Sequence, residues 1–160
     1  MRKTFLLLLL LTYMQLGCAT FVEPVLFESP VALKEGQAAV YLYRTDLYDL
    51  KDAYPFVFLN GESQGALEHK HYKLWMLDTG QYEWMIKAGS AWDELMAVDD
   101  WEIREKKITL DVSAGKYYFL RLKPSTQAHV MGWRDAKLEL VAEDNAIKGM
   151  GGNALSINNE

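Results

Sequence analysis

The chain has one cysteine, Cys18, among its 160 residues, which excludes an internal disulfide bond. Exported domains often gain stability from cysteine pairs in an oxidising compartment, so a lone cysteine calls for another explanation. Long apolar runs are also missing. The longest extends from Phe5 to Leu11, whereas a membrane-spanning helix needs about 20 apolar residues. A transmembrane helix is therefore not expected.

Basic residues do not outnumber acidic residues either. The chain has 17 Lys and Arg against 22 Asp and Glu. Loss of residues 1–17 would remove Arg2 and Lys3 but no acidic residue, leaving a net charge near −7. Nucleic acid is therefore a poor partner, and an acidic body is not drawn electrostatically to anionic lipid. Any membrane attachment must depend on Cys18.

The N-terminus has the pattern of an export signal. Arg2 and Lys3 precede the apolar run, and small residues follow it. The segment Leu16-Gly17-Cys18-Ala19 resembles a bacterial lipobox. There the cysteine sulfur takes a diacylglycerol, the peptide is cut just before the cysteine, and the new amine is usually acylated, for example by palmitate. Gln15 departs from that pattern. The alternative is an ordinary signal peptide cut after Ala19, which would release a soluble protein.

The lipobox reading implies a mature chain that begins at the acylated Cys18. By the same resemblance, Ala19 in place of aspartate favours the outer membrane, with the domain facing the periplasm. Pro24, Pro30 and Gly36 in mixed polar sequence predict a tether over residues 18–37. We expect one domain over residues 38–149 and a flexible tail over residues 150–160.

Short apolar and aromatic segments alternate with turn signals along this domain. Asn60-Gly61 predicts a tight hairpin, because both residues tolerate positive φ. From Lys70 to Leu77 the sequence alternates between two faces: one carries Tyr72, Leu74 and Met76, and the other carries His71, Lys73 and Trp75. This pattern predicts an all-β antiparallel sandwich with possible short helices near 91–98 and near the C-terminus. The expected strands span residues 39–44, 55–59, 63–67, 70–77, 82–87, 103–112, 117–122 and 137–141.

One turn motif occurs twice: an apolar residue leads through two positions to glycine, one further residue and tyrosine, at 77–82 and 112–117. Together with the opening strand 39–44 and the hairpin 58–65, this motif resembles a family of small bacterial lipoproteins. These proteins form a domain of unknown function and are similar to PEGA-type β-sandwiches. The resemblance covers roughly residues 38–123 and implies a fold but no catalytic residues.

The best candidate site is the acidic segment between two tryptophans. Carboxylates beside aromatic platforms can serve glycoside hydrolysis, or bind a sugar without chemistry. The simpler interpretation is a solvated acidic loop whose tryptophans close one end of the sandwich, since tryptophan is highly buried on average. Binding is preferred to catalysis here. The candidate ligand-binding residues are Trp92, Asp93, Asp99, Asp100 and Trp101.

The pair His69-x-His71 offers two imidazoles on one strand face, which is suitable chemistry for a transition metal. A third ligand is not evident, because His129 is distant in sequence and Glu68 is expected on the other face. Surface histidines beside Lys70 are therefore the preferred interpretation, and no metal or cofactor is expected.

These features favour a non-enzymatic, lipid-anchored envelope protein. Its β-sandwich would contact another envelope protein or peptidoglycan. The alternatives are a carbohydrate-binding module that uses Trp92 and Trp101, and, with less support, a small hydrolase that uses Asp99 or Asp100.

Overall fold

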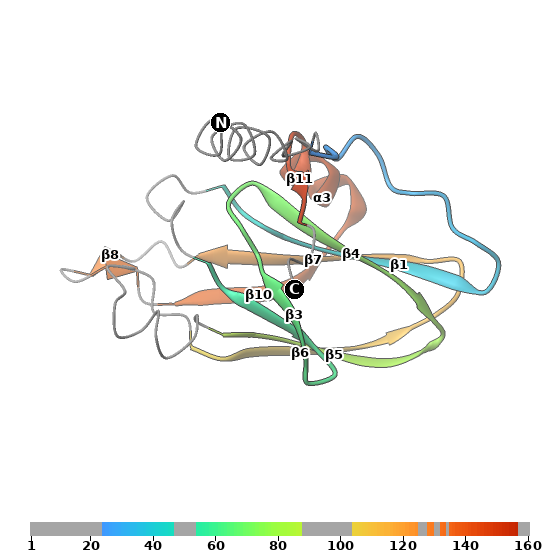
Figure 1. The fold of residues 1–160 in the computed structure, drawn as a ribbon, viewed down its shortest axis with the longest axis horizontal. Helices are drawn as coiled ribbons and strands as arrows, with labels where there is room; N and C mark the ends of the chain where they lie inside the picture. The colour runs from blue at the N-terminus through green and yellow to red at the C-terminus, as the bar shows by residue number, and fades with distance from the viewer. Residues whose placement is uncertain are drawn as a thin grey trace, which may run out of the picture.

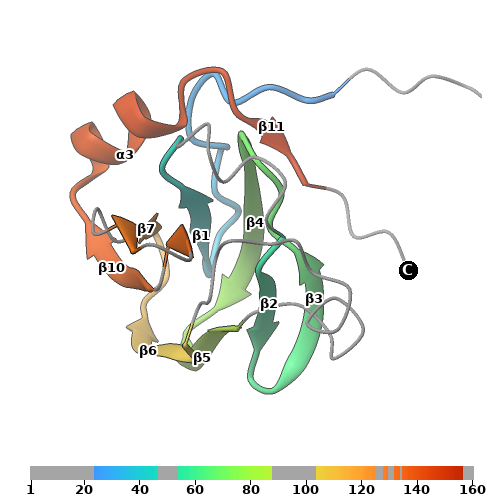
Figure 2. The same cartoon turned by 90° about the vertical axis from the view of Figure 1, so that its left-hand side faces the viewer.

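The computed structural model describes residues 24–46, 54–87, 104–124, 128–129, 132–133 and 135–156. These residues form two β-sheets packed face to face, with one short helix near the C-terminus (Figures 1 and 2). None of the helical segments among them is long and apolar enough to cross a membrane. The predicted all-β sandwich is confirmed. The helix expected near residues 91–98 lies outside the described residues.

Sheet A has five strands in the order β10-β7-β1-β4-β11. The central strand β1 is parallel to β7 and antiparallel to β4. It forms where the sequence is aromatic and β-branched without glycine or proline, as expected for a strand buried on both faces. The strands of this sheet are β1 (Gln37–Arg44), β4 (His71–Asp78), β7 (Tyr117–Pro124), β10 (Ala136–Val141) and β11 (Ala154–Leu155).

Sheet B is antiparallel, in the order β3-β2-β5-β6. Asn60 and Gly61 join β2 to β3 with φ angles of 50° and 84°, so the hairpin predicted from this dipeptide is confirmed. The strands are β2 (Phe56–Leu59), β3 (Glu62–Ala66), β5 (Gly80–Lys87) and β6 (Lys106–Val112), and a separate two-stranded ribbon pairs β8 (Ala128–His129) with β9 (Gly132–Trp133).

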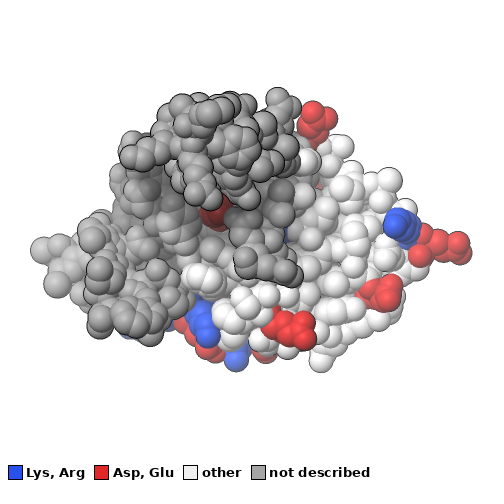
Figure 3. Space-filling view, viewed as in Figure 1, with Lys and Arg blue, Asp and Glu red and all other residues white. Residues whose placement is uncertain are grey.

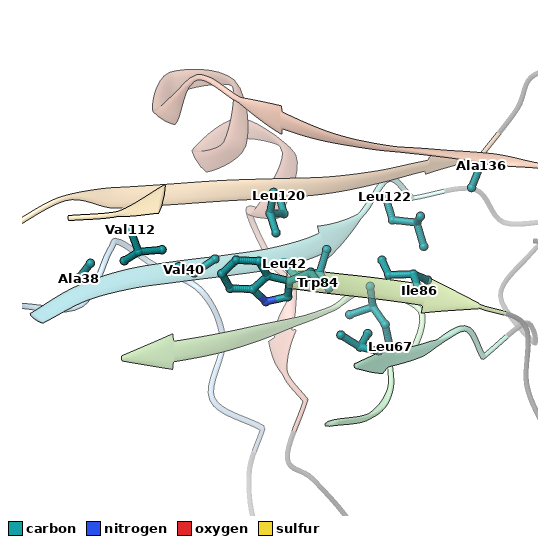
Figure 4. Packing of buried hydrophobic residues seen from close by; sticks show 11 residues of the cluster. Ala38, Val40, Leu42, Leu67, Trp84, Ile86, Val112, Leu120, Leu122 and Ala136 are labelled. Carbon is teal, nitrogen blue, oxygen red and sulfur yellow. The ribbon is translucent and has the colours of Figure 1, made fainter. Parts of the chain in front are cut away.

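The main core lies between the two sheets, around Trp84 of β5 (Figure 4). Trp84 is fully buried and packs edge to face against Trp75 of β4, with 6.0 Å between the ring centroids. Alternation along each strand supplies the inward residues. Those labelled in the figure are Ala38, Val40, Leu42, Leu67, Trp84, Ile86, Val112, Leu120, Leu122 and Ala136.

A second apolar layer covers the outer face of sheet A. Tyr41 of β1 stacks on Phe119 of β7, with 5.1 Å between the ring centroids. Helix α3 (Glu143–Met150) packs on this face through Ala146 and Met150, both fully buried. Figure 1 shows α3 and residues 24–36 on one side of sheet A and sheet B on the other.

The tether predicted over residues 18–37 is wrong for the part that the structure describes. Phe27 is buried against the outer face of sheet A, and its N–H donates to the carbonyl of Asn153 at 2.8 Å. The N–H of Val31 donates to the Tyr41 hydroxyl at 2.7 Å, and the Tyr117 hydroxyl donates to the Val31 carbonyl at 2.8 Å. Tyrosines on this face need both apolar cover and partners for their hydroxyls, and residues 24–37 supply them.

The flexible tail predicted over residues 150–160 is also wrong as far as residue 156. Met150 is fully buried and Asn153 is 5% exposed. Ala154, in β11, pairs with His71 of β4. Gly152, with φ of +81°, makes the turn that brings the chain back to sheet A. The short helix expected near the C-terminus is confirmed as α3, whereas residues 157–160 lie outside the described residues.

Candidate functional site

The connections between strands are distributed unequally over the two ends of the sandwich. At one end, called the loop end here, β1 finishes beside the end of β7, with Arg44 opposite Leu122. In sheet B, Ile86 near the end of β5 lies opposite Lys106 at the start of β6. The connections β1–β2, β5–β6 and β7–β10 therefore all leave from and return to this end.

The loop end is also where the two sheets are joined by polar contacts. Lys106 of β6 pairs with Asp135, just before β10, with 2.9 Å between Nζ and the carboxylate. Within sheet B, the N–H of Leu67, after β3, donates to the carbonyl of Pro55, before β2, at 2.8 Å. These contacts hold the strand ends of both sheets in register beneath the connections.

The opposite end is closed by short turns that bond to one another. The N–H of Ala114 donates to the Thr79 hydroxyl at 3.1 Å, and the N–H of Gly115 donates to the carbonyl of Gln37 at 2.8 Å. Since this end is closed by hydrogen bonds between its own turns, the longer connections of the loop end are the better place for recognition.

The predicted ligand-binding residues Trp92, Asp93, Asp99, Asp100 and Trp101 lie outside the described residues, as does Cys18. The structure does describe Lys87 and Lys106, the strand residues that bracket this segment, and both are at the loop end. The acidic and tryptophan-containing segment therefore starts and ends there.

Two cations are buried beneath the loop end. Arg44 is 2% exposed and Lys73 is 3% exposed. Burial lowers the pKa of the Lys73 ammonium, and the nearby Glu68 carboxylate partly opposes this effect. Lys73 Nζ donates to the Ser156 hydroxyl at 3.3 Å. The sequence alternation had already placed Lys73 on the face of Trp75, but its burial was missed because it depends on sheet B and on residue 156.

A serine beside a lysine of lowered pKa can be an activated nucleophile. Here the Ser156 hydroxyl donates to the carbonyl of Ala66 at 3.4 Å, and the Ser156 N–H donates to the carbonyl of Tyr72 at 2.8 Å. Both donors of this serine therefore bond to backbone. The contact with Lys73 is typical of structural support for the end of β11.

His69 links the buried Arg44 to the surface. The guanidinium of Arg44 donates to His69 Nδ1 at 3.3 Å, and His69 Nε2 faces Asp46 at 3.3 Å. A neutral imidazole with its proton on Nε2 satisfies both contacts. Burial, followed by the positive charge of Arg44, lowers the pKa of His69, and Asp46 partly opposes the shift.

The two histidines considered as metal ligands, His69 and His71, have separate partners. His71 Nδ1 donates to the carbonyl of His69 at 2.7 Å, and its Nε2 lies 3.4 Å from Glu68. Glu68 was expected on the opposite face. This expectation is wrong, because Lys70 adopts φ of +55° and breaks the strict alternation before β4. Within the described ranges, no three His, Cys, Asp or Glu side chains are placed to hold a metal ion.

One catalytic pattern escaped the sequence reasoning: Gly61-Glu62-Ser63-Gln64-Gly65 fits Gly-x-Ser-x-Gly, the signature of a nucleophile elbow. That motif requires a turn from a strand into a helix. Here Gly61 begins the turn into β3, and Ser63 pairs with Phe58 of β2. The segment is the return strand of a hairpin, so the match carries no catalytic geometry.

Comparison with known proteins gives a family but no activity. Residues 34–133 match the model of a family described as "Protein of unknown function (DUF2846)". The match covers all four strands of sheet B and, in sheet A, β1, β4 and β7, but not α3 or β11. A search of curated proteins found no relative that matches the chain.

Proposed function

We propose that this chain, which belongs to the DUF2846 family of proteins of unknown function, is a non-enzymatic, lipid-anchored binding module of the bacterial cell envelope. The observation that carries the proposal is the gathering of the connections β1–β2, β5–β6 and β7–β10 at the loop end. A scaffold closed at one end by short turns, with long connections at the other, is typical of binding domains.

The anchor in this proposal is Cys18. It is the chain's only cysteine, and it follows a basic start and a short apolar run. Acylation at this position explains a cysteine that cannot form an internal disulfide bond, and several acyl chains on one residue would hold the domain durably. The resemblance to small lipoproteins with PEGA-like sandwiches supports the same assignment. We place the domain at the outer membrane, facing the periplasm.

The partner in this proposal is another envelope protein, contacted through the loop end. Strand β7 offers a matched pair of positions for a test, because Lys116 and Lys123 are both exposed and stand at its opposite ends. A photo-crosslinking residue at Lys123 reports on the loop end, and the same residue at Lys116 reports on the short-turn end.

In living cells, we expect one dominant crosslinked protein from position 123 and a much weaker yield from position 116. Cys18→Ser should move the protein out of the membrane fraction or leave it uncleaved, and the crosslink should be lost. Equal yields from both positions would contradict recognition by the loop end. Processed, membrane-bound protein in the Cys18→Ser variant would contradict the anchor.

A carbohydrate-binding module is the second candidate. It is favoured by one observation: the segment with Trp92 and Trp101 begins and ends at the loop end. Titration with peptidoglycan fragments should then change the intrinsic tryptophan fluorescence, and Trp101→Ala should remove the response. Trp75→Phe is the matched control, since Trp75 packs between the sheets. An unchanged response in Trp101→Ala would eliminate this candidate.

A further inference from the structure

Exposed large apolar side chains are concentrated near the first described residues. Val25 is 58% exposed, Leu26 is 52% exposed and Val31 is 36% exposed. In the described part of the chain, the other exposed large apolar residues are Tyr54 and Leu140. Three of these five side chains therefore fall within seven residues. Val25 and Leu26 are neighbours beside β11, whereas Val31 lies apart, against Tyr41 and Tyr117. Adjacent exposed apolar side chains can mark an interaction surface.

The backbone that carries Val25 and Leu26 is held in place by hydrogen bonds to residues 153–155. Residues 25–27 run antiparallel to residues 153–155 along the edge of sheet A, with a bridge between Leu26 and Ala154. The N–H of Leu155 donates to the carbonyl of Val25 at 2.8 Å. Phe27 turns inward to the apolar layer, whereas Val25 and Leu26 are left at the surface. Their exposure thus belongs to a built edge of the fold.

The proposed lipid lies close by in the chain. From Cys18 to Val25 there are seven residues, and even a fully extended chain of this length spans at most about 25 Å. An acyl group on Cys18 therefore keeps this edge within that distance of the bilayer. Residues 24–36 and α3 lie on the side of sheet A that faces away from sheet B (Figure 1).

We infer that Val25 and Leu26 form a lipid-contacting edge that seats the domain on the bilayer, with sheet B turned away from it. This inference rests on the proposed function, because it requires acylated Cys18. We expect this edge to be attracted to the bilayer by apolar contact and not by charge. Acidic and basic side chains are interspersed on the described surface seen in Figure 3, and the net charge of the processed chain, without Arg2 and Lys3, is near −7.

The test uses full-length protein, processed in bacteria and reconstituted in phosphatidylcholine–phosphatidylethanolamine vesicles. Leu26→Cys and Leu140→Cys are a matched pair, since both leucines are about half exposed. An environment-sensitive thiol fluorophore labels only the introduced cysteine when Cys18 carries lipid. Spin-labelled lipid then quenches a fluorophore that contacts the bilayer. Mass spectrometry of the N-terminal peptide reports acylation separately.

We expect blue-shifted emission and several-fold stronger quenching by lipid at position 26 than at position 140. Equal quenching at both positions in acylated protein would overturn the inference and leave the anchor standing. A blue shift at position 26 without quenching by lipid would point to a protein surface and would also overturn it. An unacylated Cys18 would overturn the proposed function and, with it, this inference.

Discussion

Substitution of Gly149 in α3 by alanine should destabilise the protein, although helix propensity alone predicts the opposite. A Cβ atom at position 149 would lie 2.8 Å from both Cε2 and Oη of Tyr43. Tyr43 is 1% exposed on the outer face of sheet A. Its ring cannot swing into solvent, so either the ring or the helix must shift.

The expected size follows from two opposing effects. Replacing glycine by alanine within a helix stabilises by about 0.5–1 kcal/mol. Forcing an extra carbon into a packed interior costs about 1–3 kcal/mol. The free energy of unfolding should therefore fall by about 1 kcal/mol, which lowers the melting temperature of a domain of this size by about 3–5 °C.

Gly151→Ala is the control, two residues further along. Its Cβ would meet only the carbonyl oxygens of Lys148 and Ile147, at 3.8 and 3.9 Å, which is ordinary contact. Urea and thermal denaturation of both variants, in a soluble Cys18→Ser background, would separate them. If Gly149→Ala were as stable as Gly151→Ala, or more stable than the parent, the packing of α3 on Tyr43 described here would be wrong.

Three further predictions concern stability. Gly115→Val should lower the free energy of unfolding by more than about 1 kcal/mol, because Gly115 has φ of +75° and a β-branched residue is strained there. A melting temperature equal to that of the parent would contradict this. Phe27→Ala should lower the free energy of unfolding by about 3 kcal/mol, as is usual when a buried phenylalanine is truncated. If residue 27 belonged to a tether, urea denaturation would not change. The pKa of His69 is lowered in the folded protein, so its contribution to stability is complete above pH of about 6.5 and is lost as the pH falls through the folded pKa. Denaturation between pH 7 and 5 should thus show a shallower loss of stability for His69→Gln than for the parent, and identical slopes would refute the assignment.

Local chemistry was enough to predict much of the sandwich. The alternation from Lys70 to Leu77 placed Tyr72 and Leu74 on the face opposite to Trp75, and the structure has them so, with Trp75 turned toward sheet B. Asn60-Gly61 and Gly115 marked turns because both need backbone angles that most residues avoid. Such signals depend on residues close in sequence, so they can be read without the fold.

The candidate site was predicted less well. The residues around Arg44 and Lys73 in the sequence do not indicate that these side chains are buried. Their burial arises where the two sheets and the end of β11 meet. Ligand binding by Trp92 and Trp101 stays a prediction. Only the strand ends around them, Lys87 and Lys106, are described, and these ends make the loop end the place to test it.

The sequence by itself determined the strands of the sandwich, their inward and outward faces and the tight turns, because periodicity and backbone preference act over a few residues. Only the tertiary structure decided that Phe27 and Met150 belong to the folded body. Both lie in segments whose proline or glycine content and mixed polarity are typical of loops. Their burial comes from an aromatic face built by residues far away in sequence, and that face exists only after β1, β4 and β7 have paired.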